Sequence, residues 1–253
     1  MVKVNRLSAY TDEADNSIEY SGPPAGGQFE VVFKGRGNRI IAPTGVKIEY
    51  LSVHFDCDNG TLILGANSNV GGIKASVRIG QDATVKFGNN VNMTGRCYIS
   101  AMEGRTVSFG HDVMIAQENE FRSDDAHPIF DVDSGKRVNV SKNVVIGNHV
   151  WFAKGAVALS GARVGDGTVI GFRSLVNGPI PNNCVAVGSP AKIVRRNIAW
   201  ERPHLSLVAP YYKNDASSVT KSQYWKRTED MIPIYPKKGL YQRLKAAFSA
   251  FRM

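Results

Sequence analysis

One histidine in this chain lies in a polar stretch where it could remove a proton from a substrate. His127 follows two acidic residues in Ser123-Asp124-Asp125-Ala126-His127. An imidazole, with an unperturbed pKa of about 6.5, can accept a proton from a poor nucleophile such as a hydroxyl group. A nearby carboxylate could orient the ring or stabilise the imidazolium, and Asp124, Asp125 and Asp131 are close enough in sequence. His127 could thus serve as a general base with Asp124 as its first candidate partner, and the alternative is a solvent-exposed loop histidine.

The stretch around His127 interrupts a six-residue repeat. Downstream of it, every sixth residue is apolar, and the residue four places after each of the first five is small or β-branched. The apolar members are Ile146, Phe152, Ala158, Val164, Ile170 and Val176. A helix with 3.6 residues per turn would spread this pattern around its surface. Short strands joined by tight turns explain it, with the apolar residue pointing inward and glycine relieving the turn at Gly147, Gly165 and Gly171.

The same period is present upstream, with interruptions. It runs through Phe87, Met93 and Ile99, breaks around residues 102–105, and resumes at Phe109, Ile115 and Phe121. Over residues 1–78 the period is loose, so we expect irregular first coils. We therefore predict a solenoid domain over residues 1–196, a projecting loop at 122–143, and an extension over 197–253.

The repeat resembles that of the hexapeptide-repeat acyltransferases. The loop sequence, Ser123 to Asp131 followed by Gly135 to Asn139, is similar to the loop of sugar and capsular-polysaccharide O-acetyltransferases, including polysialic acid O-acetyltransferases. The resemblance implies an all-β fold, a left-handed parallel β-helix with a protruding loop and a C-terminal extension containing a short helix. It also implies that acetyl-CoA is the acyl donor, that His127 is the general base, and that the chain forms a homotrimer with active sites between adjacent β-helices.

The resemblance further assigns residues to the acetyl-CoA site. Trp151 points outward in its hexapeptide and matches a tryptophan at that site, although a neighbouring subunit or the C-terminal tail could instead cover it. Lys192 and Arg195 match basic positions that reach the phosphates of CoA, and Lys154 and Phe172 match positions along the pantetheine slot. A solvated basic terminus is the alternative for the two cations.

Two departures from the family pattern concern substrate contacts. Asn177 and Gly178 stand where these enzymes often have Thr-Lys, so one cofactor contact is lost or supplied elsewhere. Cys97 and Tyr98 stand near the position of an acceptor-binding asparagine. We therefore expect acceptor recognition to differ from that of the small sugar acetyltransferases.

Composition limits the other classes of function. The chain has 253 residues, 43% of them apolar, which suits one main domain. Its N-terminus lacks the apolar core of a signal peptide and no stretch is long and apolar enough to span a bilayer, so we expect a cytoplasmic protein. Its three widely spaced cysteines predict neither a disulfide framework nor a metal motif. The close histidine pair of zinc-dependent β-helix carbonic anhydrases is absent, so no metal is expected.

The extension is basic and aromatic. Residues 197–253 contain ten Lys or Arg against four Asp or Glu, out of a net charge of +9 for the chain. Near the end, Leu240, Leu244, Phe248 and Phe251 recur at helical spacing. Such a helix could cap the solenoid or hold a neighbouring subunit, or it could lie on the anionic inner membrane. No nucleic-acid recognition motif accompanies the charge.

These observations together predict an acetyl-CoA-dependent O-acetyltransferase that acts on a bacterial capsular or O-antigen polysaccharide or its precursor. Two alternatives stay open at this point. One is N-acetylation of a nucleotide-linked amino sugar on the same fold. The other is a non-catalytic β-helix that binds glycans.

Overall fold

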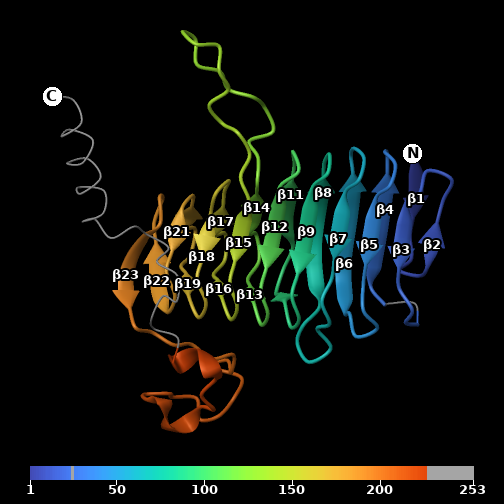
Figure 1. Ribbon diagram of the computed structural model, residues 1–253. Helices are drawn as coiled ribbons and strands as arrows, with labels where there is room; N and C mark the ends of the chain where they lie inside the picture. The colour runs from blue at the N-terminus through green and yellow to red at the C-terminus, as the bar shows by residue number, and fades with distance from the viewer. Residues whose placement is uncertain (24–25, 227–253) are drawn as a thin grey trace.

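The computed structural model describes residues 1–23 and 26–226, and in it the chain winds into a solenoid of about seven stacked, mostly parallel coils (Figure 1). Three sheets, which we name A, B and C, form its faces. Sheet A contains β1 (Val2–Val4), β4 (Gln28–Phe33), β6 (Ile48–Phe55), β8 (Ile73–Ile79), β11 (Cys97–Ala101), β14 (Glu120–Arg122), β17 (Val157–Ala158) and β20 (Leu175–Val176). Sheet B contains β2 (Tyr10–Thr11), β3 (Ser17–Glu19), β5 (Arg39–Ile41), β7 (Thr61–Ile63), β9 (Thr84–Phe87), β12 (Thr106–Phe109), β15 (Val144–Ile146), β18 (Arg163–Val164) and β21 (Pro179–Ile180). Sheet C contains β10 (Asn92–Met93), β13 (Met114–Ile115), β16 (Trp151–Phe152), β19 (Val169–Ile170), β22 (Cys184–Val187) and β23 (Lys192–Arg196).

The length of a coil changes along the chain. Equivalent corner residues are 22 apart between Asn89 and His111, 37 apart between His111 and Asn148, and 18 apart between Asn148 and Asp166. A coil of 18 residues is three hexapeptides, which is the regular repeat expected after Ile146. The shorter interruption at residues 102–105 is an enlarged turn between sheets A and B, and the loop at 123–143 is a much larger excursion at the same corner.

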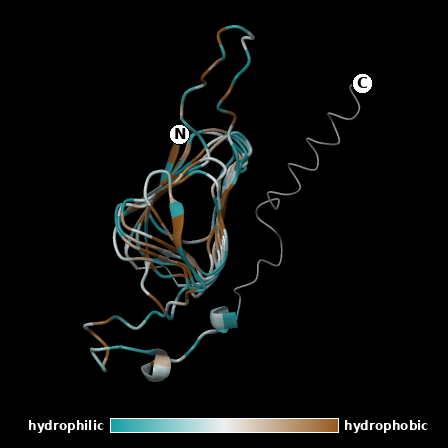
Figure 2. Ribbon diagram, turned by 90° about the vertical axis from the view of Figure 1, so that its left-hand side faces the viewer, coloured by the Kyte–Doolittle hydropathy of each residue, from teal (hydrophilic) through white to brown (hydrophobic). Residues whose placement is uncertain are grey.

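The predicted inward residues form one continuous core. Equivalent apolar side chains from successive coils stack on one another inside the prism, as in Phe87 and Phe109, whose ring centroids are 4.9 Å apart. Phe121 packs edge-on against both Phe109 and Phe152. Burial of such side chains contributes about 1.5–3 kcal/mol each, so the stack is the main source of stability for coils that are too short to fold alone. Seen end-on, the coils surround a single axis (Figure 2).

The glycines of the repeat have a different role from the one predicted. Gly88 and Gly147 do not adopt the positive φ that would mark them as turn residues. A Cβ at Gly88 would instead lie 2.4 Å from the carbonyl oxygen of Gly110 in the next coil, and one at Gly147 would lie 2.4 Å from Asp166 Oδ1. These glycines are required because neighbouring coils approach closely at the corner between sheets B and C.

The left-handed backbone at that corner falls on other residues, two places further along the chain. Asn90, Asp112, His149 and Asn183 have φ values of 59°, 60°, 51° and 49°. Asn and Asp tolerate this conformation better than most residues because their short polar side chains bond locally. One edge of the prism is therefore lined with polar side chains at equivalent positions.

Beyond β23 the described part of the extension contains two short 3₁₀-helices, η1 (Ala216–Ser218) and η2 (Gln223–Lys226). The helix predicted near residues 240–251 lies outside the described residues. Among the residues that the structure describes, none belongs to a helix long and apolar enough to cross a membrane.

Candidate functional site

The loop that contains His127 leaves the prism at the corner between sheets A and B (Figure 1). At its base Asp124 is buried. Its Oδ2 accepts a hydrogen bond of 2.7 Å from Ser100 Oγ on β11, and its Oδ1 accepts one of 2.9 Å from the amide of Ala126. Arg122 Nη2 lies 3.7 Å from the same carboxylate. Asp124 thus fixes the first turn of the loop to sheet A.

A second anchor lies at the other end of the loop. Glu103, in the turn of the preceding coil, accepts hydrogen bonds from the side chains of Arg137 and Ser141. The Arg137 guanidinium, together with the Ser141 hydroxyl, lowers the pKa of Glu103 to about 2. The loop is therefore held by a carboxylate at each end, one buried and one exposed.

The amide of Asn139 shapes the loop around His127. Its Nδ2 donates to the carbonyl oxygen of His127 at 2.8 Å and to Asp125 Oδ2 at 3.0 Å, while its Oδ1 accepts from the amide of Ile129 at 2.7 Å. His127 itself is exposed, and its imidazole has no hydrogen-bond or ion-pair partner within residues 1–23 and 26–226. In the single chain Asp124 therefore positions the loop backbone, and its carboxylate bonds to Ser100 and Ala126 and not to the ring that it was assigned to orient.

Three of the residues assigned to acetyl-CoA lie along another edge of the prism, between sheets C and A. Lys154 and Phe172 occupy equivalent turns of adjacent coils, since the carbonyl of Lys154 accepts from the amide of Arg173 at 3.0 Å. Lys192, at the start of β23, lies opposite Val187 of β22 in the antiparallel pair that ends the solenoid, at the same edge of sheet C. Phe172 is 61% exposed, and Lys154 forms an ion pair of 3.1 Å with Glu118. The edge offers two cations and an exposed aromatic ring to a ligand, and the guanidinium of Arg173 lies 5.3 Å from the centroid of that ring.

The other assigned positions lie elsewhere. Asn177 and Gly178 follow β20 at the corner between sheets A and B, where the carbonyl of Gly178 accepts from Arg163 N at 3.2 Å. They share that corner with the loop of His127. Arg195 pairs with Val185 further along β23, away from the edge that carries Lys192.

Trp151 lies on sheet C, and part of the extension covers it. Its ring centroid is 5.9 Å from that of Trp200, with the planes tilted by 47°. In the single chain, therefore, the C-terminal tail covers part of Trp151, which was the alternative to a role at the acetyl-CoA site. Trp151 nevertheless keeps partial exposure, so one side of the ring can still meet a ligand.

The extension docks through His149 at the corner between sheets B and C. The buried imidazole stacks on Trp200 at 4.1 Å and on Tyr224 at 4.6 Å, with planes within 13° and 2° of its own. Its Nδ1 lies 2.6 Å from Asp112 Oδ2 and its Nε2 lies 2.9 Å from the carbonyl oxygen of Trp200. We name His149, Trp200, Tyr224, Asp112 and Arg202 the tail clasp.

Protonation of the clasp follows from its donors and acceptors. Burial opposes ionisation of Asp112, but hydrogen bonds from His149 and the Arg202 guanidinium outweigh it and lower the pKa of this carboxyl. Arg202 Nε donates to Asp112 Oδ1 at 2.6 Å. A carbonyl oxygen can only accept hydrogen bonds, so Nε2 of His149 donates to Trp200. The imidazole ring is thus held at both nitrogens while it lies between two aromatic rings.

Sequence reasoning missed the clasp and the anchors of the loop. A glycine followed two residues later by Asn, Asp or His, as at Gly88, Gly110 and Gly147, was a readable signal for the polar edge. Nothing in the sequence marks Glu103, because its partners Arg137 and Ser141 are distant in the chain. Asn139 belongs to the loop segment that resembles the family, but its bonds to Asp125, His127 and Ile129 are defined only by the shape of the loop. Within the described part of the chain no group of three or more His, Cys, Asp or Glu side chains could hold a metal ion.

The sequence of this chain is similar to those of known acetyltransferases. No family model matches the chain. The polysialic acid O-acetyltransferase of Neisseria meningitidis is 30% identical over 189 residues, which are 74% of this chain and 86% of that protein. The chain belongs to the sugar O-acetyltransferases, a family of acetyl-transferring enzymes. The polysialic acid O-acetyltransferase of Escherichia coli O1:K1 is 38% identical to it over 128 residues, which are 51% of this chain but only 39% of that relative's length.

Solved structures in this family share the fold. The polySia-specific acetyltransferase NeuO superposes with a TM-score of 0.64 and 32% identity, covering 74% of this chain and 89% of its own. The polysialic acid O-acetyltransferase OatWY gives 0.59 and 27%, covering 69% and 82%. Membership of this family of sugar O-acetyltransferases and the hexapeptide β-helix expected from the sequence are thereby confirmed.

Proposed function

We propose that this protein transfers the acetyl group of acetyl-CoA to a hydroxyl of a bacterial surface polysaccharide or its precursor. The observation that carries the proposal is the exposed imidazole of His127, held on an anchored loop with no hydrogen-bond or ion-pair partner among the described residues. The acceptor to test first is polysialic acid, because two relatives are named for acetylating it.

His127 acts in this proposal as the general base. Its imidazole takes the proton of the acceptor hydroxyl while the hydroxyl oxygen attacks the thioester carbonyl. The new C–O ester bond forms, the C–S bond breaks, and the CoA thiolate leaves with the proton that His127 returns. Base assistance of this kind contributes about 10² to 10⁴ in rate. Asp124 contributes by fixing the loop that presents the ring.

The acyl donor would lie along the edge between sheets C and A. There Lys154 and Lys192 supply charge for phosphates and Phe172 supplies an exposed ring for the pantetheine chain. Trp151, on the adjoining face, would shape the donor site from the side that Trp200 leaves uncovered. Arg195 remains a candidate for a more distant phosphate contact.

One chain does not bring the two halves of this site together. His127, Asn177 and Gly178 lie at the corner between sheets A and B, whereas the edge of Lys154 and Phe172 joins sheets C and A. We therefore propose a homotrimer in which each site joins one edge from each of two chains. The loop's exposed Ile129, Phe130 and Val132, 55%, 56% and 95% accessible in the single chain, support this arrangement, since such side chains call for a covering surface.

The test is thiol release from acetyl-CoA with polysialic acid and with other purified capsular and O-antigen polysaccharides as acceptors. We expect release with at least one polymer and a product ester that mild alkali hydrolyses. A product that resists alkali would favour acetylation of an amine. If no polymer caused thiol release and calorimetry detected no CoA binding, the proposed reaction would be rejected in favour of a non-catalytic, glycan-binding scaffold.

A further inference from the structure

The outer face of sheet A carries a polar trough that the proposed chemistry does not use. Outward side chains of successive strands align in rows: Glu30, Ser52, Ser76, Tyr98 and Glu120 form one row, and Val32, His54, Arg78, Ser100 and Arg122 form the next. The serines are small where their neighbours are long, so they leave a depression between taller walls.

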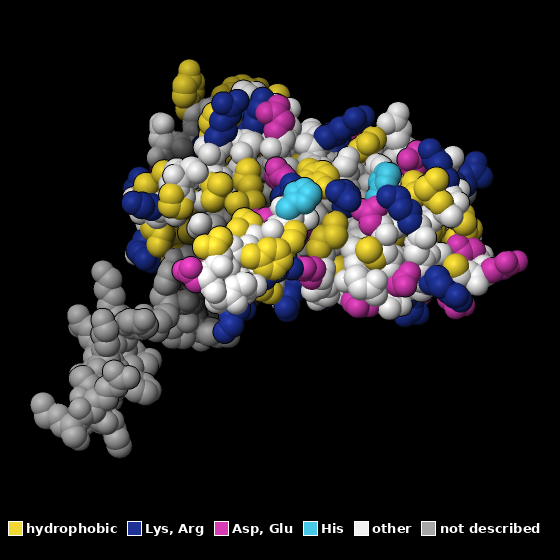
Figure 3. Space-filling view, turned by 90° about the horizontal axis from the view of Figure 1, so that it is seen from above, with side chains coloured by type: hydrophobic (Ala, Val, Ile, Leu, Met, Phe, Trp, Pro, Cys, Tyr) yellow, Lys and Arg dark blue, Asp and Glu magenta, His cyan; other side chains and the backbone are white. Residues whose placement is uncertain are grey.

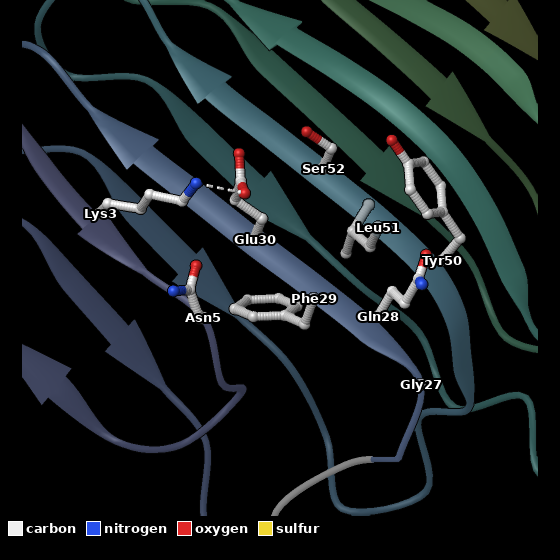
Figure 4. Close-up of a pocket in the computed structure, with 9 residues that line it drawn as sticks. All are labelled: Lys3, Asn5, Gly27, Gln28, Phe29, Glu30, Tyr50, Leu51 and Ser52. Atoms are coloured by element: carbon white, nitrogen blue, oxygen red, sulfur yellow. Dashed lines mark ion pairs between the residues drawn. The ribbon is translucent and has the colours of Figure 1, made fainter.

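Two hollows mark this depression, and they share Ser52. One, of about 360 Å³, is lined by His54, Ser76, Arg78 and Tyr98 among others. The second, of about 440 Å³, lies over β1, β4 and β6, where Lys3, Glu30, Tyr50 and Ser52 stand around it (Figure 4). The trough therefore crosses at least five strands, from β1 to β11.

The trough leads to the loop of His127. Ser100, in its second row, donates to Asp124 at the base of that loop, and Arg122 lies beside the same carboxylate. A polymer lying along the trough would thus have its next units at the foot of the segment that holds the proposed base.

The side chains of the trough suit sugar rings. Tyr50 and Tyr98 are half-exposed aromatic rings, and a guanidinium lies over each, that of Arg96 at 3.9 Å and that of Arg122 at 5.6 Å from the ring centroid. A sugar would meet the remaining surface of these rings together with the cations beside them. Serine and tyrosine hydroxyls can both donate to and accept from sugar hydroxyls. Coils repeat about every 4.8 Å, close to the length of one sugar unit in an extended chain, so successive units would meet successive members of one row.

Other partners fit less well. Cations and anions are interleaved on this side of the molecule (Figure 3), and Asp56 forms ion pairs with both Lys34 and Arg78. A nucleic acid would require a surface of one sign. A protein partner would require an apolar centre, whereas the outward residues here are almost all polar.

Resting on the proposed function, we infer that the outer face of sheet A is a binding track for the acceptor polysaccharide, which holds several sugar units and delivers the chain to the site at His127. The track binds an extended, hydroxyl-rich glycan, and Arg78 and Arg122 in its second row lie where they can meet the carboxylates of an acidic sugar.

The track is tested by filling it. Ser76→Trp places a large ring on the floor of the trough, and Ser108→Trp places the same ring on an outward position of β12 on sheet B, away from the track. The full chain and both variants are run by native electrophoresis in gels containing polysialic acid or dextran. We expect at least one polymer to retard the native protein, Ser76→Trp to bind about tenfold more weakly, and Ser108→Trp to match the native protein.

The outcomes separate the track from the catalytic proposal. Retardation by neither polymer, or equal effects of the two variants, overturns the track. Thiol release measured on the same preparations reports the reaction independently. Loss of polymer binding in Ser76→Trp, while acetyl transfer to short oligosaccharides continues, supports the track. Normal polymer binding in the native protein without any acetyl transfer would reject the proposed function alone.

Discussion

His149 and Trp200 bond to each other twice. The indole Nε1 of Trp200 donates to the carbonyl oxygen of His149 at 2.9 Å, and Nε2 of His149 donates to the carbonyl oxygen of Trp200 at 2.9 Å. Their rings stack at the same time. The pair joins a corner of the coil to the extension, and it lies next to Trp151 of the proposed donor site.

Replacing Trp200 with alanine should release the extension. The side chain is 8% exposed, and truncation of a buried tryptophan costs about 3–5 kcal/mol, less where the site can relax. We expect a lower melting temperature and faster amide exchange over residues 197–226. Tyr212→Ala is the matched control, because that ring is 86% exposed. Unchanged exchange in Trp200→Ala would show that the clasp does not hold the extension.

His127→Ala should remove catalysis and leave the fold intact. We expect kcat to fall by about 10² to 10⁴ with the melting temperature unchanged, since the imidazole is exposed and has no bonding partner among the described residues. Added imidazole should restore part of the rate. Asn139→Ala, which loosens the backbone around His127, should lower the rate without rescue by imidazole. Full activity in His127→Ala would reject the base assignment.

Acid should release the loop by protonating Glu103. Its pKa is about 2 in the folded protein and about 4.5 when unperturbed, so its contribution is fully present above about pH 4.5 and is lost as the pH falls toward 2. We expect residues 123–143 to lose exchange protection in that range before the core strands do. In Glu103→Gln the loop should already exchange freely at neutral pH. Protection that does not change between pH 5 and 2 would contradict this anchoring.

The sequence was sufficient for the solenoid because period and burial coincide. A residue such as Phe109 must be apolar in every regular coil, so the repeat reports the core directly. The position of His127 on a projecting loop follows from the same reasoning, because an excursion from a stacked coil must occur at a corner. The partners of Asp124 and His149 could not be predicted in this way, since Ser100 and Trp200 lie 24 and 51 positions away in the sequence and meet them only when the coils have folded.

The role of the repeat glycines provides a stability test of the coil contacts. In Gly88→Ala the new Cβ would lie 2.4 Å from a backbone oxygen that cannot move aside without separating two coils. Such overpacking costs about 1–3 kcal/mol, which lowers the melting temperature by several degrees in a protein of this size. Gly178→Ala is the matched control for melting, because no atom lies within 4 Å of a Cβ built there. Equal melting of the two variants would mean that neighbouring coils can move apart to admit the methyl group at little cost.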